Sequence, residues 1–265
     1  MDRRVGERDQ LERELRLAIA HDMIRPFFQP VVNLSNRKTV GFEAVPRWFH
    51  LSLGEIPPER FIPIAEDNGS IHILSEQLLK HACTTALQWP DDVVLAFNLF
   101  PGQLRDRDLK SRIVSVLERT QLPPHRLEIQ IAERALVDDL EAARDTLGSL
   151  RETGIKIVLV NFGTGYSSLY HLRNFKLDKI KIDRSFVESW EAGLESSKII
   201  NALVGLGHGL GLTVSADGIG NMDQGVSLRD TGCEQGQGFM FGGAVPADQT
   251  RDYLLQEQHA VRQSN

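Results

Sequence analysis

Cysteine, aromatic residues and long apolar runs are all scarce in this sequence of 265 residues. The two cysteines, Cys83 and Cys233, do not have the spacing of a metal site, and with no secretory signal upstream they predict free thiols in a reducing cytoplasm. No apolar run reaches the roughly 18 residues that a membrane-spanning helix needs. Residues 1–10 are charged and lack the apolar core of a signal peptide. We therefore expect a cytoplasmic protein without membrane insertion.

A surplus of positive charge is missing too. Lys and Arg total 30 against 36 Asp and Glu, a formal net charge of −6. Such a chain has no basic field for a nucleic-acid backbone, although a few local cations can still hold a small anionic ligand. With 41% hydrophobic residues it can bury one barrel-sized core. We predict a charged N-terminal extension over 1–10, a single domain over 11–257 and a disordered tail over 258–265.

What the sequence does contain is an alternation of apolar runs and helical patterns. Strands are predicted at residues 26–34, 39–48, 93–99, 126–133, 156–161, 179–183, 212–217 and 236–239. Helices are predicted at residues 9–21, 58–68, 72–88, 108–120, 138–153, 196–209, 222–231 and 247–256. Eight strands alternating with helices indicate an α/β fold, a TIM-like (β/α)8 barrel. Residues 35–38 are too few for a parallel crossover, so an N-terminal hairpin should make one barrel strand antiparallel.

Four short motifs carry a family resemblance. An apolar run at 158–162 stops at a glycine- and serine-rich loop, and three further motifs occupy residues 42–48, 180–183 and 237–239. Together they resemble the EAL family of cyclic di-GMP phosphodiesterases over almost the whole chain. The resemblance implies a ligand pocket at the C-terminal ends of the barrel strands, where such folds collect functional groups.

The resemblance also implies metal ligands, and several of these are replaced. Gln130 stands where a glutamate is expected, and Val160 and Asn161 stand where the family has two aspartates. Mg²⁺ and Mn²⁺ prefer anionic oxygen ligands, and a valine supplies no oxygen at all. We therefore expect divalent metal binding to be weak or lost, no cofactor, and no hydrolysis, with Glu43 and Lys181 as catalytic remnants.

Other positions of the family pattern are kept. The resemblance implies ligand binding by Gln29, Glu43, Arg47, Asn98, Lys181, Asp183, Asp217 and Gln237, with Arg47 on phosphate and Asp217 one methylene shorter than the family residue. Glu133 matches a glutamate that steadies the loop at 162–169. Simpler alternatives remain open: a surface salt bridge for Arg47, an ion pair with Asp183 for Lys181, and a hydrogen-bond network that merely closes the barrel mouth.

These observations lead to three functional hypotheses. The leading one is a catalytically inactive cyclic di-GMP receptor that binds the dinucleotide and regulates a protein partner, with homodimer formation as a possible part of signalling. The alternative is a ligand-free interaction module that regulates a partner through its surface. The third is a weak cyclic di-GMP phosphodiesterase.

Overall fold

The computed structural model describes residues 2–136, 140–164, 174–189 and 194–263. Its strands are β1 (Arg25–Asn33), β2 (Thr39–His50), β3 (Gly54–Ile56), β4 (Val94–Leu99), β5 (Leu127–Ala132), β6 (Lys156–Phe162), β7 (Lys179–Ile182), β8 (Thr213–Ala216) and β9 (Gln235–Gly236). Its helices are α1 (Asp2–Ala20), α2 (Pro58–Asp67), α3 (Ile71–Ala86), α4 (Leu109–Thr120), α5 (Leu140–Arg151), α7 (Arg184–Glu188), α8 (Leu194–Gly209), α9 (Met222–Asp230) and α10 (Ala247–Gln263).

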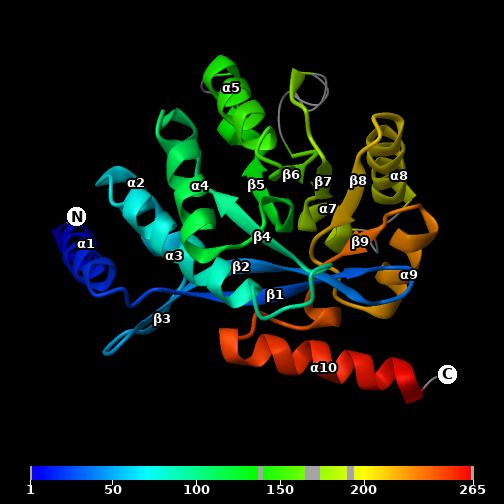
Figure 1. Ribbon diagram of the computed structural model, residues 1–265, viewed down its shortest axis with the longest axis horizontal. Coiled ribbons are helices and arrows are strands. Elements are labelled where there is room, and N and C mark those ends of the chain that lie inside the picture. Colours follow the sequence, from blue (N-terminus) through cyan, green and yellow to red (C-terminus); the bar gives the residue numbers. More distant parts are fainter. Residues whose placement is uncertain (1, 137–139, 165–173, 190–193, 264–265) are drawn as a thin grey trace.

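The sheet closes into a barrel. Nine strands follow the order β1-β9-β8-β7-β6-β5-β4-β2-β3, and a further pairing of β1 with β2 completes the ring and leaves β3 outside it. Neighbouring strands from β2 and β4 through to β9 are parallel, whereas β1 is antiparallel to both of its neighbours. The predicted TIM-like barrel and its antiparallel strand are thus confirmed (Figure 1).

The hairpin of β1 and β2 extends beyond the barrel. β2 leaves its parallel partner β4 after the pair Ala44–Phe97 and continues to His50, where it pairs with the short strand β3. This third hairpin strand was not predicted from the sequence. The strand has only three residues, of which two are exposed, and Leu51 in the preceding turn is 95% exposed. So short a segment shows no alternation of apolar and polar residues that would predict a strand.

Helix α10 packs against the outer side of the hairpin (Figure 1). Its Thr250 hydroxyl accepts a hydrogen bond of 2.9 Å from the indole Nε1 of Trp89, and both side chains are buried. The Trp89 ring lies 4.8 Å from that of Phe42 and 5.5 Å from that of Phe28, an aromatic cluster between helix and barrel. α10 runs to Gln263, so residues 258–263, predicted as part of a disordered tail, are helical.

The chain around Gly238 differs from the predicted strand at 236–239. β9 ends at Gly236, and residues Phe239–Phe241 form a 3-10 turn. Gly238 has a φ of 152°, and a Cβ there would overlap the backbone of Ile219. Close backbone contact therefore replaces strand pairing at this point.

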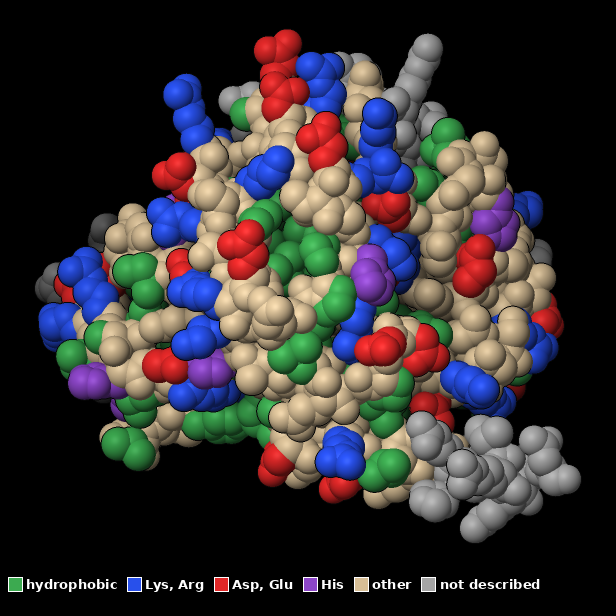
Figure 2. All heavy atoms as spheres, viewed as in Figure 1, with side chains coloured by type: hydrophobic (Ala, Val, Ile, Leu, Met, Phe, Trp, Pro, Cys, Tyr) green, Lys and Arg blue, Asp and Glu red, His purple; other side chains and the backbone are tan. Residues whose placement is uncertain are grey.

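The surface carries both signs of charge. Figure 2 shows acidic and basic side chains interspersed over the face in view, in agreement with the small net charge. Both cysteines are free and buried, and burial raises the pKa of each thiol to about 12. Within the described residues, no helix is long and apolar enough to cross a bilayer.

Candidate functional site at the barrel mouth

Lys181 lies at the centre of the mouth. It points inward from β7 and is 5% exposed. An ammonium offers three N–H donors, and Lys181 Nζ donates to Glu43 Oε2 at 2.6 Å, Gln130 Oε1 at 3.2 Å and Gln237 Oε1 at 3.2 Å. Its ion partner is thus Glu43 rather than Asp183. Every hydrogen of the ammonium has a protein acceptor.

Glu43 is held on both oxygens. Oε2 accepts from Lys181 at 2.6 Å and Oε1 accepts from Asn98 Nδ2 at 2.6 Å. Burial by itself would raise the pKa of Glu43. The charge of Lys181 and the hydrogen bonds from Lys181, Asn98 and Gln237 outweigh burial and lower the pKa. Glu43 is therefore a firmly ionised carboxylate whose charge is already balanced.

The network continues to the antiparallel strand. Gln237 Nε2 donates to Gln29 Oε1 at 3.0 Å, and Gln29 Nε2 donates to the carbonyl of Gly242 at 3.5 Å. Hydrogen bonds therefore join side chains from β1, β2, β4, β5 and β7 and from the turn after β9. Five of the eight predicted ligand-binding residues meet here: Gln29, Glu43, Asn98, Lys181 and Gln237.

Asp217 is a second carboxylate beside this network. Burial, and to a smaller extent the charge of Glu43, raise its pKa despite the cations of Lys181 and Arg184. Its Oδ1 accepts a hydrogen bond of 2.7 Å from the backbone N–H of Gly218. A Cβ at Gly218, which has a φ of 81°, would overlap the Arg184 side chain, so a glycine allows Arg184 to approach.

Asp183 and Arg47 do not join the network. Asp183 caps α7, because its Oδ1 accepts from Ser185 N at 2.9 Å and from Ser185 Oγ at 2.5 Å. Arg47 Nε lies 3.2 Å from Glu55 Oε1, an ion pair across the extended hairpin. Arg47 thus forms a surface salt bridge in this structure, as the simpler alternative predicted. Its contact with ligand phosphate stays a prediction.

Three expected metal-ligand positions carry other chemistry. Val160 is 7% exposed and presents only carbon. Asn161 is exposed, with a φ of 56° at a bulge between β6 and β7. Gln130 is 2% exposed and acts as an acceptor for Lys181, a part in the network that the sequence did not reveal. Among the described residues, no three His, Cys, Asp or Glu side chains gather in a metal-binding arrangement.

The loop after β6 is only partly described. Thr164 donates to the carbonyl of Asn161 from its N–H at 3.4 Å and from its hydroxyl at 2.8 Å, but residues 165–169 lie outside the described chain. Glu133 is 2% exposed at the start of a short 3-10 helix, Glu133–Leu136, directly after β5. Its role in steadying that loop stays a prediction.

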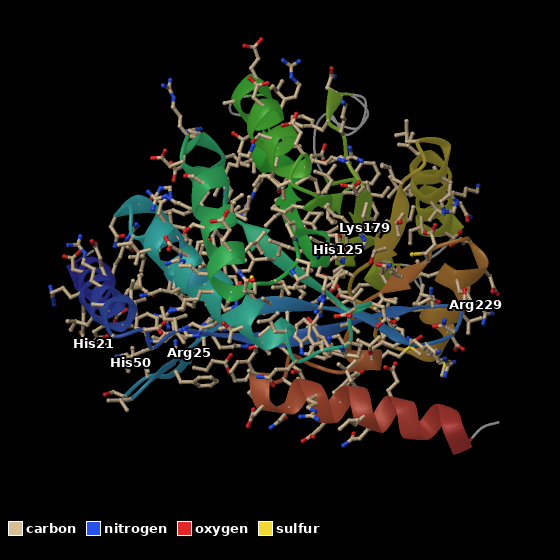
Figure 3. The ribbon with its side chains drawn as sticks, viewed as in Figure 1. His21, Arg25, His50, His125, Lys179 and Arg229 are labelled. Carbon is tan, nitrogen blue, oxygen red and sulfur yellow. The ribbon has the colours of Figure 1, made fainter. Side chains whose placement is uncertain are left out.

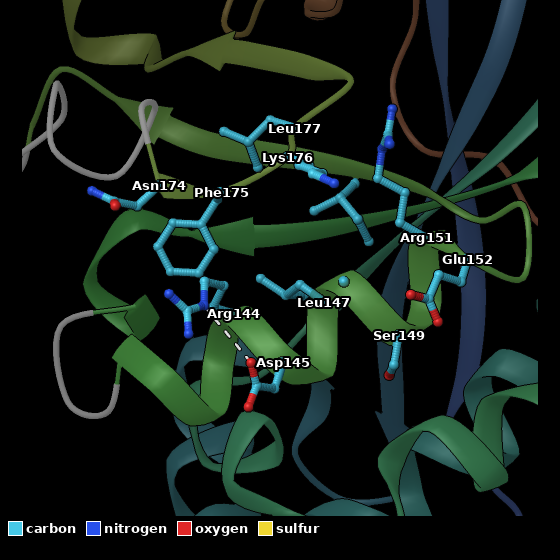
Figure 4. Close-up of a pocket in the computed structure, with 12 residues that line it drawn as sticks. Arg144, Asp145, Leu147, Ser149, Arg151, Glu152, Asn174, Phe175, Lys176 and Leu177 are labelled. Atoms are coloured by element: carbon cyan, nitrogen blue, oxygen red, sulfur yellow. Dashed lines mark ion pairs between the residues drawn. The ribbon is translucent and has the colours of Figure 1, made fainter.

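A wider cavity of about 480 Å³ lies elsewhere, between α5 and residues 174–177 (Figure 4). None of the mouth side chains lines it. Its charges are largely balanced, because Arg144 pairs with Asp145 at 3.7 Å and Arg151 Nη2 donates to Asp178 at 3.0 Å. The size of this cavity therefore does not make it a better candidate than the mouth.

Two mouth residues were missed by sequence reasoning. Arg184 sits beside Asp217, and its guanidinium carbon lies 5.9 Å from the centre of the Phe239 ring. Glu59, in the first turn of α2, lines a cavity that also touches Glu43 and Asn98. Position offered a signal for Arg184 alone, since it follows directly on the predicted strand at 179–183, whereas Glu59 lies in a predicted helix.

Comparison with known proteins agrees with this geometry. The model of the EAL domain matches residues 12–244. The cyclic di-GMP phosphodiesterase NbdA of Pseudomonas aeruginosa is 33% identical over 92% of this chain and 32% of its own length. An uncharacterized protein of Sinorhizobium fredii, y4lL, is 38% identical over 96% of the chain and 31% of its own length. The chain thus spans about a third of these relatives.

A solved structure gives the same answer. The MucR phosphodiesterase of Pseudomonas aeruginosa, in complex with cyclic di-GMP, has a TM-score of 0.87 and 34% identity, covering 91% of this chain and 99% of that one. Such a match extends over the whole barrel and its mouth. This chain therefore belongs to the EAL domain family.

Proposed function

We propose that this EAL domain binds cyclic di-GMP at the barrel mouth without hydrolysing it and passes the signal to a protein partner. The observation that carries the proposal is Lys181, whose three donors are taken by Glu43, Gln130 and Gln237. The Lys181 ammonium is thus the cation at the centre of the mouth, and it already neutralises the Glu43 carboxylate. The identity of the ligand is suggested by relatives that are named phosphodiesterases, one of which was solved in complex with cyclic di-GMP.

Loss of the metal centre is part of the same proposal. A two-metal phosphodiesterase needs several carboxylates to balance its ions. Here Val160 and Gln130 contribute none, Asn161 is neutral, and burial raises the pKa of Asp217. Divalent ions in this setting would keep much uncompensated charge in a partly desolvated site, at several kcal/mol per ion.

Hydrolysis is tested by incubating the protein at high concentration with cyclic di-GMP and Mg²⁺ or Mn²⁺, followed by chromatography of the nucleotides. We expect the cyclic dinucleotide to stay intact. Turnover at about 1 per second or faster, abolished in Glu43→Ala, would show that the domain is an enzyme.

Binding is tested by calorimetry with cyclic di-GMP in chelator and again in Mg²⁺. We expect the same affinity in both buffers. Binding that requires Mg²⁺ would restore a metal to the site, and no binding in either buffer would favour the ligand-free interaction module instead.

A further inference from the structure

The cavity between α5 and residues 174–177 has the size of a small-molecule site. Its volume is about 480 Å³, within the roughly 300 to 1,000 Å³ that such sites enclose. Four buried apolar side chains from α5, β6 and the segment before β7 line it: Leu147, Ile157, Phe175 and Leu177. Figure 4 shows the Phe175 ring and the Leu147 side chain directed into the space between α5 and this segment. The cavity thus offers an apolar floor that includes an aromatic ring.

This cavity is separate from the barrel mouth. Val158 on β6 is the register partner of Lys179, whose side chain lies inside the barrel, so Val158 faces inward too. Neighbouring residues of a strand point to opposite faces, and Ile157 therefore faces outward. None of the lining residues takes part in the hydrogen-bond network of Lys181. A ligand in this cavity would not compete for the mouth.

Gly148 of α5 keeps the cavity open. Glycine is among the least favourable residues in a helix interior, so its presence there calls for a reason. Its φ is not positive, and a Cβ added at this position would meet no atom within 4 Å. Neither backbone conformation nor close packing therefore requires a glycine. A larger side chain here would extend into the cavity that Gly148 lines.

Two charged groups at this cavity have no side-chain partner within the described chain. The other charged side chains of the lining are engaged in the ion pairs given above. The Lys176 ammonium and the Glu152 carboxylate remain, and neither makes a hydrogen bond or an ion pair with a described residue. In Figure 4 the Glu152 carboxylate points back toward Leu147, and Lys176 lies across the cavity from α5. The cavity therefore presents one free cation and one free anion.

A free cation and a free anion beside an apolar floor match a zwitterion with an apolar body. An ammonium donates and a carboxylate accepts, and hydrogen bonds between charged groups are stronger than those between neutral ones. A simple anion would be repelled by Glu152 and a simple cation by Lys176, so each meets an unfavourable charge as well as a favourable one. An aromatic ring would also pack against the Phe175 ring. An apolar α-amino acid combines these features.

We propose that this cavity binds a free α-amino acid with an apolar side chain, and an aromatic one in preference. The carboxylate of the ligand binds Lys176, its ammonium binds Glu152, and its side chain lies on Leu147 and Phe175. The inference does not rest on the proposed function, because the two sites share no residue.

The test is calorimetry with L-phenylalanine and two analogues. Phenylpropionate lacks the ammonium, and phenethylamine lacks the carboxylate. We expect L-phenylalanine to bind at least about tenfold more tightly than either analogue, because each analogue loses one charge-assisted hydrogen bond and keeps one repulsion.

Three variants place the ligand in this cavity. Gly148→Leu fills the cavity at a helix position that favours leucine over glycine, so it should fold and should abolish binding. Lys176→Gln and Glu152→Gln should each weaken binding of L-phenylalanine about tenfold. The matched controls Lys198→Gln and Glu118→Gln remove the same charges at exposed positions that do not line the cavity, and both should bind like wild type. Thermal melting checks that all variants are folded.

Three results would overturn the inference. Wild type that does not bind L-phenylalanine removes the ligand class. Phenylpropionate or phenethylamine binding as tightly as L-phenylalanine shows that only one of the two charges is used. Binding that survives in Gly148→Leu places the ligand elsewhere. Each of these outcomes leaves the cyclic di-GMP titrations at the mouth unaffected, so the two proposals fail separately.

Discussion

Two lysines of β7 point into the same barrel and have different surroundings. Lys179 Nζ, deep in the ring of strands (labelled in Figure 3), donates to both oxygens of Glu128 at 2.8 and 2.7 Å, and both residues are buried. Lys181, two residues further along the strand, shares its donors between one carboxylate and two amides. The deep pair is closed on itself, whereas the pair at the mouth belongs to a network.

The difference separates a structural pair from an adjustable one. Burial lowers the pKa of Lys179 although Glu128 works in the opposite direction, so the deep ammonium is there at a cost in solvation. At the mouth, Lys181 donates to the neutral amides of Gln130 and Gln237, and losing either acceptor would leave no charged group without a partner. Under the proposed function a ligand phosphate would replace an amide at Lys181, whereas Lys179 is bonded to both oxygens of the buried Glu128.

The largest effect is expected from breaking the deep pair. Glu128→Ala should lower the free energy of unfolding by about 3–5 kcal/mol, because it leaves the Lys179 ammonium buried without a partner. Urea denaturation measures the loss. The double variant Glu128→Leu with Lys179→Met should recover most of it, and a double variant as unstable as the single one would show that packing, not charge, is lost.

Breaking the pair at the mouth should cost less stability. Lys181→Met removes the donor of three hydrogen bonds and leaves Glu43 with Asn98, so we expect a loss of about 1–3 kcal/mol by the same denaturation assay. Cyclic di-GMP affinity should fall in the same variant. A loss as large as that of Glu128→Ala would erase the distinction between the two lysines.

Arg47→Ala should change binding more than stability. Its pair with Glu55 lies at the surface and is worth roughly 0–1 kcal/mol, whereas losing an arginine contact to phosphate weakens binding about ten- to a hundredfold. The matched control is Glu55→Ala, which breaks the same pair but keeps Arg47 and should bind at least as well as wild type. Calorimetry in chelator decides, and equal affinity of Arg47→Ala and wild type would contradict the use of Arg47.

Acid should act on the mouth through Glu43. Its pKa is lowered from 4.5, so its contribution to stability is complete above that value and is lost as the pH falls through the folded-state pKa. The stability difference between wild type and Glu43→Gln should therefore shrink in denaturation series taken below pH 4.5. A difference independent of pH would mean that the charge of Glu43 contributes nothing.

The smallest effect is expected at Asp217, with the opposite sign. Its pKa is raised from 3.8, chiefly by burial, so its contribution to stability is complete below that value and is lost as the pH rises through the folded-state pKa. Asp217→Asn keeps an acceptor for Gly218 and should raise the melting temperature slightly at pH 7. Near pH 3 the two proteins should melt together, and a variant that is less stable at pH 7 would refute this sign.

The sequence predicted the barrel well because its evidence is local. The short link at 35–38 forces a hairpin, and the hairpin makes one strand antiparallel whatever the rest of the chain does. The helix boundaries were less certain, because a helix end depends on packing against the body of the domain, and α10 runs seven residues beyond its predicted end at residue 256.

The site was predicted as a set of residues and not as a set of contacts. Lys181 was identified, but its partner Glu43 lies 138 residues away and its partner Gln237 lies 56 residues away. Strand register and barrel closure decide which side chains meet across such separations, and neither can be read from motif spacing. The same reason explains why a surface salt bridge was left open for Arg47 without naming its partner, Glu55.

The backbone at Asn161 has a consequence for how such a mouth can change over time. Its φ of 56° is a conformation that asparagine and aspartate both adopt more readily than most residues. The Thr164 hydrogen bonds reach the carbonyl of Asn161 and not its side chain, so they are indifferent to its charge. An acidic and a neutral version of this position therefore share one backbone. Replacing Asn161 by aspartate would therefore exchange a side-chain nitrogen for an oxygen without asking the backbone of this bulge to change.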